Sequence, residues 1–286
     1  MKPPLFRYHD PENVAEVLAL LGQCGNAKLL AGGQSLMPML NMRFVLPDDV
    51  IDLNRVGALA FIRENGGVLE IGAMTRQRDL ERDAVVRNAC PLLADAISHV
   101  GHQQTRNRGT LGGSLCHLDP SAELVAAAMA LDAVVTIAGP SGSRELPFAQ
   151  FPQAYMMPAI GTDELLTAVR FPLWQSSHGH AFIEFSRRHG DFAVCAVAVM
   201  LEKNGAGMIT RASVTVAGLD AAPVRVREVE QALLGQTASE ALFCAAAEHC
   251  RALDALGDVH APASYRKHLA VVLTRRALIQ ADARCR

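Results

Sequence analysis

Apolar and polar residues along the first 57 positions follow first a helical and then a strand spacing. Asp10 and Pro11 fit the cap and the first position of a helix. An apolar stripe at helical intervals continues from there: Val14, Val17, Leu18 and Leu21. The apolar runs 27–31 and 50–53 have the length of strands, and a glycine pair follows the first run. This order predicts a small βαβ unit.

The pattern changes at about residue 58. Two apolar runs flank Asn65, Gly66 and Gly67, a turn sequence that favours a β-hairpin. The elements expected from there to residue 176 are hairpin strands at 60–63 and 68–73, helices within 75–100, a glycine-rich stretch at 109–113, a helix from Asp119 and Pro120 to Leu131, and strands at 133–138 and 165–171. The loop-like segment 172–179 predicts a domain boundary. The first domain is then 1–176, with subdomains at about 1–57 and 58–176.

The remaining residues, 177–286, order their elements differently. The predicted strands are 181–187, 192–203 and 208–218, with a turn at Asn204 and Gly205 between the second and the third. The predicted helices are 226–234, 239–253 and 264–283, and Thr237 with Glu240 has capping-box spacing. Strands followed by helices in blocks are typical of an α+β unit, here a three-stranded sheet with three helices.

Composition narrows the class of protein. The 286 residues carry 27 Lys and Arg against 29 Asp and Glu, and only 5% are aromatic, which argues against a nucleic-acid binder. Apolar stretches such as 192–201 are too short for a membrane span, and the N-terminus lacks the apolar core of a secretory signal. The seven cysteines include no CxxC pair. We therefore expect a cytoplasmic protein.

Two glycine-rich loops carry the candidate chemistry. They read Ala31-Gly32-Gly33-Gln34-Ser35 and Thr110-Leu111-Gly112-Gly113-Ser114. Paired glycines let a backbone approach a ligand and point successive N–H groups at it, as in phosphate-binding loops, and the serine and threonine hydroxyls add donors. The two loops could hold one diphosphate from both sides. The alternative, that each glycine pair only forms a turn, stays open. Neither loop has the Rossmann or the P-loop pattern.

Both loops lie in longer motifs. The segments LLAGGQSLMPMLNMR and RNRGTLGGSLCHLDPSAEL resemble the two FAD-binding signatures of the flavoprotein medium subunits of molybdenum hydroxylases. That family includes aerobic carbon monoxide dehydrogenases, quinoline oxidoreductases and the flavin domain of xanthine dehydrogenase. The resemblance also covers FRYHDPENVAEVLALL, IGAMTR, SRRHGDFAV and SYRKHLAVVLTRRAL, and so runs along nearly the whole chain.

The resemblance implies a fold and a site. The fold is an FAD-binding region of the vanillyl-alcohol-oxidase and murein-reductase (PCMH) type in two subdomains, followed by a C-terminal domain of the carbon monoxide dehydrogenase flavoprotein type. The two loops would hold the pyrophosphate of non-covalent FAD. Glu123 matches a carboxylate, often Asp in relatives, that accepts from flavin-side hydroxyls. Asp119 lies in the matching DP pair, and alternatively caps a helix with Pro120 at its first position. Phe192 matches a position beside the flavin ring, often Tyr, and alternatively begins a buried strand.

The implied function is electron transfer. A large partner subunit would carry the molybdenum cofactor, and a small one would carry two [2Fe–2S] clusters and pass electrons to this chain for delivery to an external acceptor. The usual assembly is a dimer of heterotrimers. The GGSLCH form of the second loop is closest to subunits that serve N-heterocycle hydroxylases. No residue is assigned a catalytic acid–base role, because the flavin performs the redox step.

Other functions are less well supported by the residues. A stand-alone flavin oxidoreductase and an FAD-less scaffold both remain alternatives. The pairs His99 with His102 and His178 with His180 lack a third ligand nearby in the sequence, so no metal site is predicted. The isolated cysteines match no iron–sulfur spacing, and the resemblance implies that such clusters lie in partner subunits only.

Overall fold

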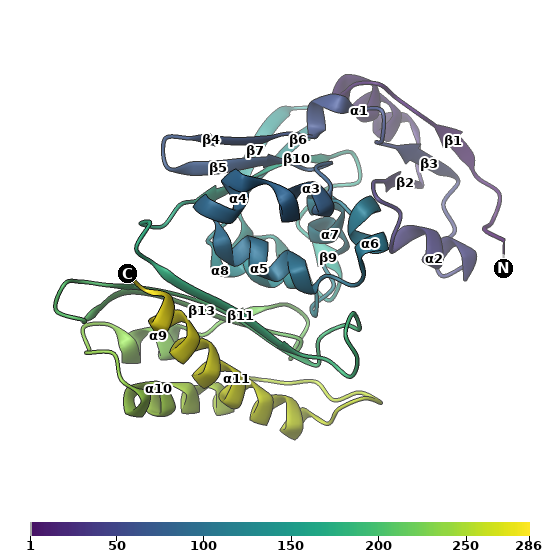
Figure 1. Ribbon diagram of the computed structural model, residues 1–286. Coiled ribbons are helices and arrows are strands. Elements are labelled where there is room, and N and C mark those ends of the chain that lie inside the picture. The colour runs from purple at the N-terminus through teal and green to yellow at the C-terminus, as the bar shows by residue number, and fades with distance from the viewer. Residues whose placement is uncertain (1) are drawn as a thin grey trace.

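The computed structural model describes residues 2–286, and the three larger of its four sheets belong to three successive units of the chain (Figure 1). The N-terminal unit is a parallel sheet in the order β1-β3-β2. Its elements are β1 (Arg7–His9), α1 (Val14–Gln23), β2 (Ala27–Leu30), α2 (Leu36–Asn41) and β3 (Asp49–Asp52). The βαβ prediction is confirmed and extended by β1. The cap of α1 is Asn13, whose side chain accepts from the Glu16 amide at 3.0 Å, so the prediction of Asp10 was wrong; Asp10 pairs with Arg55 instead.

The middle unit packs six helices against a five-stranded antiparallel sheet in the order β4-β5-β10-β6-β7. The strands are β4 (Ile62–Asn65), β5 (Val68–Gly72), β6 (Val134–Gly139), β7 (Gly142–Pro147) and β10 (Leu165–Pro172). The helices are α3 (Gln77–Arg82), α4 (Ala84–Ala89), α5 (Pro91–His99), α6 (Gln103–Arg108), α7 (Leu111–His117) and α8 (Glu123–Ala130). Two short 3₁₀ turns, Gly57–Leu59 and Phe148–Gln150, and a hairpin of β8 (Pro152–Ala154) and β9 (Met157–Pro158) complete it.

The C-terminal unit has four strands, so the predicted three-stranded sheet was wrong. The elements are β11 (Gly179–Phe185), β12 (Cys195–Lys203), β13 (Ile209–Ala217), β14 (Val224–Arg225), α9 (Arg227–Leu233), α10 (Glu240–Ala247), a 3₁₀ turn (Glu248–Ala252) and α11 (Ala263–Arg284). The fourth strand, β14, is only two residues long and leaves no periodic signal. The cap of α10 is Ser239, which accepts from the Leu242 amide at 3.2 Å, and not the predicted Thr237.

Strand β12 is buried on both faces because two layers of helices enclose its sheet. Ala196, Ala198 and Met200 belong to the core that β12 shares with the middle unit, where α8 and α5 contact the strand. Their neighbours Cys195, Val197 and Val199 belong to the C-terminal core, on the side of α11. Figure 1 shows the sheet lying between these two layers. Across residues 2–286 no helix combines the length and the apolar character needed to cross a bilayer.

Candidate functional site

The first glycine loop leaves the end of β2 with unpaired amides. Gly33 has a φ of +73°, which a glycine adopts without strain. Within residues 2–286, none of the four successive N–H groups from Gly32 to Ser35 donates a hydrogen bond to protein. Backbone donors in this state need another partner, and successive free amides form a concave site for an anion. The loop is therefore prepared to hold a charged oxygen group.

The structure brings the two glycine motifs together. A Cβ atom placed on Gly32 would lie 2.3 Å from the carbonyl oxygen of Arg108 and 2.7 Å from the Cα of Gly109. A Cβ on Gly113 would lie 3.3 Å from the Cβ of Ala31. Only glycine at position 32 permits this approach, because any side chain would collide with the facing backbone. The predicted juxtaposition of the two motifs is thus observed.

The second motif is the start of a helix and not an open loop, which corrects the prediction. Thr110 caps α7, and its Oγ1 accepts from the Gly113 amide at 3.0 Å. The amides of Leu111 and Gly112 donate to the carbonyls of Thr75 and Ala73 at 3.1 and 2.8 Å. A Cβ on Gly112 would lie 2.6 Å from the Cβ of Ala73. This glycine pair therefore permits close packing, and both of its amides donate to protein acceptors.

Replacing Thr110 by valine is expected to destabilise the junction. The change keeps the shape of the side chain and removes the cap of α7, which costs about 1 kcal/mol of unfolding free energy. We expect the Tm to fall by about 2–4 °C. Thr110→Ser retains the hydroxyl and serves as the control in thermal unfolding followed by circular dichroism. Equal Tm values for the valine variant and the parent would contradict the capping role.

Two arginines that the sequence reasoning did not single out hold the motifs in place. Arg76 donates to the carbonyl of Arg108 and to the side chain of Asn54. Asn54 in turn donates from Nδ2 to the carbonyl of Ala31 at 3.1 Å. Through Asn54, Arg76 thus links Ala31, the residue before the first glycine pair, to Arg108, which lies two residues before Thr110. Both arginines lie in segments quoted above, IGAMTR and RNRGT, but their contact depends on the tertiary fold.

The junction is electropositive. Partial burial, together with the nearby Arg108, lowers the pKa of Arg76. Arg108 and the loop residues Gly32, Gly33 and Gln34 line a groove of about 420 Å³. An anion placed in this groove would lie beside Arg108 and could accept hydrogen bonds from the free amides. This arrangement fits a diphosphate such as that of FAD.

Glu123 is the first residue of α8, the helix after α7. This helix contacts β12 and β13 of the C-terminal sheet. The side chain is buried, and burial, with a contribution from the carboxylate of Glu184, raises the pKa of Glu123 to about 8. His99 lies 3.5 Å from Glu184 through Nδ1, and the Glu184 carboxylate raises the pKa of that histidine. The second oxygen of Glu184, Oε2, is buried without a hydrogen-bond partner within the described chain. Burial therefore favours the neutral form of the Glu123 carboxyl group.

The other two predicted residues have different surroundings. Asp119 accepts from the Ser121 amide at 2.8 Å, and α8 is capped by Ala122, so Asp119 does not cap the helix and Pro120 is not its first residue. Phe192 is 65% exposed and precedes β12 by three positions, so the alternative that it begins a buried strand was wrong. The turn before it places Gly190, at a φ of +87°, against the His102 ring.

Comparison with known families accounts for most of the chain. Residues 4–174 match the family described as the FAD binding domain in molybdopterin dehydrogenase. Residues 180–281 match the CO dehydrogenase flavoprotein C-terminal domain. The chain belongs to the flavoprotein medium subunits of the molybdenum hydroxylases. The predicted family, FAD as cofactor and the assignment to an oxidoreductase are thereby confirmed.

Individual relatives match this medium subunit along its whole length. It is 38% identical to the 6-hydroxypseudooxynicotine dehydrogenase complex subunit alpha of Paenarthrobacter nicotinovorans, covering 100% of this chain and 97% of the relative. It is similar to a chain of the carbon monoxide dehydrogenase from Hydrogenophaga pseudoflava, with a TM-score of 0.97, 37% identity and 100% coverage of both. For quinoline 2-oxidoreductase from Pseudomonas putida 86 the TM-score is 0.95, with 32% identity and 99% coverage of both.

Proposed function

We propose that this medium subunit holds FAD non-covalently and transfers electrons from [2Fe–2S] clusters of a small partner subunit to an external acceptor. The observation that carries the proposal is the row of four unpaired amides from Gly32 to Ser35, closed over by the backbone of Arg108 and Gly109. FAD, when bound, supplies the redox chemistry, and the chain supplies binding, orientation and charge.

The residues have separate roles in this proposal. Residues 31–35 bind the diphosphate through amides and the Ser35 hydroxyl, and Arg108 adds positive charge. Residues Thr110, Leu111, Gly112, Gly113 and Ser114 form the wall behind it, because their packed helix start fixes the position of Arg108. Glu123 lies at the flavin end, where burial favours its neutral carboxyl group, which can donate a hydrogen bond as well as accept one. Asp119 and Phe192 complete that end.

The remaining parts of the proposal concern architecture and partners. Residues 1–176 form the PCMH-type domain, with subdomains at about 1–57 and 58–176, and residues 177–286 form the C-terminal domain. The partners are a large subunit with the molybdenum cofactor and a small [2Fe–2S] subunit, assembled as a dimer of heterotrimers. The GGSLCH segment and the likeness to quinoline 2-oxidoreductase support a nitrogen heterocycle as substrate of the large subunit. Free thiols at all seven cysteines support a cytoplasmic location.

The test is the identity and behaviour of the chromophore. The chain is expressed alone and with both partner subunits, the visible spectrum is recorded, and the cofactor is released by denaturation and identified by chromatography. We expect FAD at about one per chain, released without proteolysis because it is non-covalent. Addition of a nitrogen heterocycle to the anaerobic complex should bleach the flavin, and an added acceptor should restore it.

Three results would contradict all or part of the proposal. Turnover of a small alcohol or phenol by the chain alone would indicate a stand-alone flavin oxidoreductase. A complex that assembles without flavin would indicate a scaffold subunit. Flavin that is present in the complex but not reduced through the small subunit would contradict the electron route while leaving FAD binding intact.

A further inference from the structure

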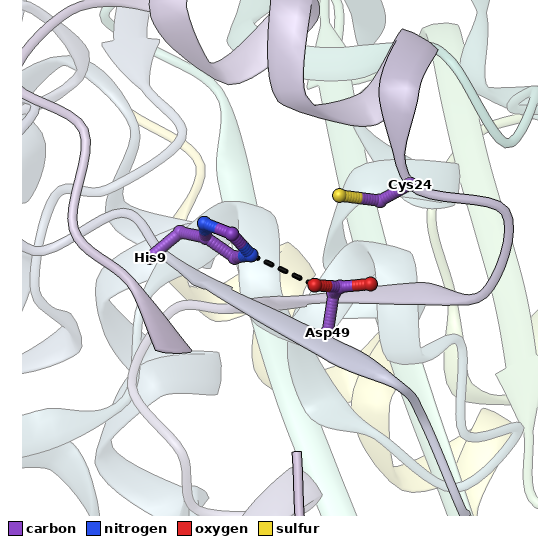
Figure 2. Close-up of side chains that lie close together, drawn as sticks. All are labelled: His9, Cys24 and Asp49. Atoms are coloured by element: carbon purple, nitrogen blue, oxygen red, sulfur yellow. Dashed lines mark hydrogen bonds and ion pairs between the residues drawn. The ribbon is translucent and has the colours of Figure 1, made fainter. Parts of the chain in front are cut away.

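A histidine, a cysteine and an aspartate meet in the N-terminal unit, away from the glycine motifs (Figure 2). His9 ends β1, Cys24 follows α1, and Asp49 begins β3. One ligand atom from each residue lies within 4.8 Å of the other two, and His9 Nε2 is 2.8 Å from Asp49 Oδ1. The carboxylate of Asp49 is buried, with 1% of its side chain exposed, whereas His9 is partly open to solvent.

A cation already neutralises this buried carboxylate. The guanidinium of Arg7 donates to both oxygens of Asp49, with Nε and Nη2 each at 2.7 Å. This contact, together with His9, holds the pKa of Asp49 well below its usual range. The Arg7 side chain is 72% exposed, so it can turn outward into water without disturbing the core. The position beside Asp49 is thus a cation site that an exposed and replaceable side chain occupies.

We propose that His9, Cys24 and Asp49 form a binding site for a divalent transition metal ion, with Zn²⁺ as the preferred occupant. An imidazole nitrogen, a thiolate and a carboxylate are the three ligand types that zinc takes in proteins. Tetrahedral zinc, with bonds of about 2.0–2.3 Å, sets its ligand atoms about 3.5 Å apart. The ligand atoms, all within 4.8 Å of one another, therefore need to move by only about 1 Å on binding, with His9 and Asp49 separating slightly. Water fills the fourth position at the exposed side of His9.

The site would join three elements that the sheet alone connects weakly. Strand β1 is three residues long and pairs only with β3, and α1 ends at the residue before Cys24. Partial burial and the neighbouring Asp49 raise the pKa of the Cys24 thiol, so the metal must displace a proton from sulfur. A bound ion would fix β1 and the end of α1 to β3, and would stabilise the unit that presents the first glycine motif.

The test is cobalt spectroscopy on the full-length chain without an affinity tag. The chain is stripped with a chelator and titrated with Co²⁺ in the absence of oxygen, and Zn²⁺ is then added as competitor. We expect the visible bands of tetrahedral cobalt, a thiolate-to-cobalt charge-transfer band at one ion per chain, and the loss of both when zinc enters. A titration without the charge-transfer band would overturn the proposal.

Four variants assign the signal to residues. Cys24→Ser should abolish the charge-transfer band and weaken binding at least ~10-fold, and His9→Asn should weaken it similarly while it retains the thiolate band. Cys244→Ser, at an exposed cysteine on α10, is the matched control and should leave the titration unchanged. Arg7→Ala should tighten binding, because it removes the competing cation. A band that persists in Cys24→Ser, or an affinity that Arg7→Ala fails to raise, would overturn the proposal.

Thermal unfolding gives an independent readout. At ~100-fold excess over Kd, Zn²⁺ should raise the Tm of the parent and of Cys244→Ser by about 5 °C. The Tm of Cys24→Ser should not respond, and its circular dichroism in the absence of metal shows whether it is folded. An equal response of both serine variants would overturn the assignment to Cys24. Neither readout depends on flavin, so the result is separate from that of the proposed function.

Discussion

Replacement of Gly32 by alanine is expected to weaken FAD binding about 10- to 100-fold. The added methyl group would lie 2.3 Å from the carbonyl oxygen of Arg108 and 2.7 Å from the Cα of Gly109, and both are backbone atoms that cannot turn aside. The two motifs must therefore move apart, which displaces the free amides from Arg108. Flavin content per purified chain, and the Kd from fluorescence quenching of added FAD, measure the effect.

Gly25→Ala is the matched control for this substitution. Gly25 lies in the same N-terminal unit, and a Cβ placed there would meet no atom within 4 Å. The control should retain flavin at the level of the parent. If Gly32→Ala retains it equally well, the close approach of the motifs is unnecessary for binding, and the assignment of the diphosphate to this junction is wrong.

The second large effect is on the pH dependence of stability. We expect Glu123→Gln to make the unfolding free energy depend less on pH. Burial raises the pKa of Glu123 from 4.5 to about 8, so the folded chain keeps a proton that the unfolded chain has released. Between these two values the folded state binds more protons than the unfolded state, and the unfolding free energy therefore falls as the pH rises. By about pH 8 the loss attributable to Glu123 is on the order of 4 kcal/mol.

Denaturant unfolding at several values between about pH 5 and 8 measures this loss. Glutamine keeps a neutral, hydrogen-bonding side chain at every pH. The unfolding free energy of the variant, relative to that of the parent, should therefore increase steadily as the pH rises. The charge pair of His99 and Glu184 is present in both proteins and largely cancels in the difference. Parallel pH profiles for the parent and the variant would contradict a raised pKa at Glu123.

A second buried glutamate, Glu230, serves as a control, because its replacement by glutamine should destabilise the protein. Glu230 accepts from Arg227 at 2.9 Å, from the Val214 amide at 2.8 Å and from Arg225. Glu230→Gln removes the charge that these guanidinium groups require, and should lower the unfolding free energy by about 3 kcal/mol across the same pH range. Burial alone therefore does not decide the outcome; the partners of the carboxylate do.

Much of the secondary structure could be predicted, because it follows from local periodicity. The hairpin at Gly66 and Gly67 follows from its turn residues, and the long strands β12 and β13 follow from apolar runs of strand length, because both faces of their sheet are buried. Strand β7 lies at a sheet edge and is largely exposed, and β14 is two residues long, so neither leaves such a pattern.

The sequence allowed the glycine residues of the candidate site to be predicted, but not the hydrogen bonds that surround them. A glycine pair such as Gly32 and Gly33 indicates a position where another backbone or a ligand can approach closely. At Gly112 and Gly113 the same pattern accompanies a helix start, whose amide partners, the carbonyl of Ala73 and the hydroxyl of Thr110, could not be predicted because the first comes from another element. Arg76 has no local signal of its contact with Arg108, 32 residues further on.

Long-range pairing also hid the cluster of His9, Cys24 and Asp49. Metal motifs are read from short spacings, such as two ligands on one helical turn. Here each ligand comes from a different element, and the parallel register that opposes Arg7 to Asp49 brings them together. The histidine pairs noted in the sequence, for which no metal site was predicted, belong to no such group of three among residues 2–286.

The double burial of β12 has a consequence for the connection between the two halves of the chain. The segment 173–178 joins β10 to β11, yet the halves are held together by the apolar faces of Ala196, Ala198 and Met200 against the middle helices. A single proteolytic cut in this connector should therefore leave the fragments associated under native conditions. The two pieces, produced from separate genes, should reassemble by complementation, and the intact chain should melt in one cooperative transition.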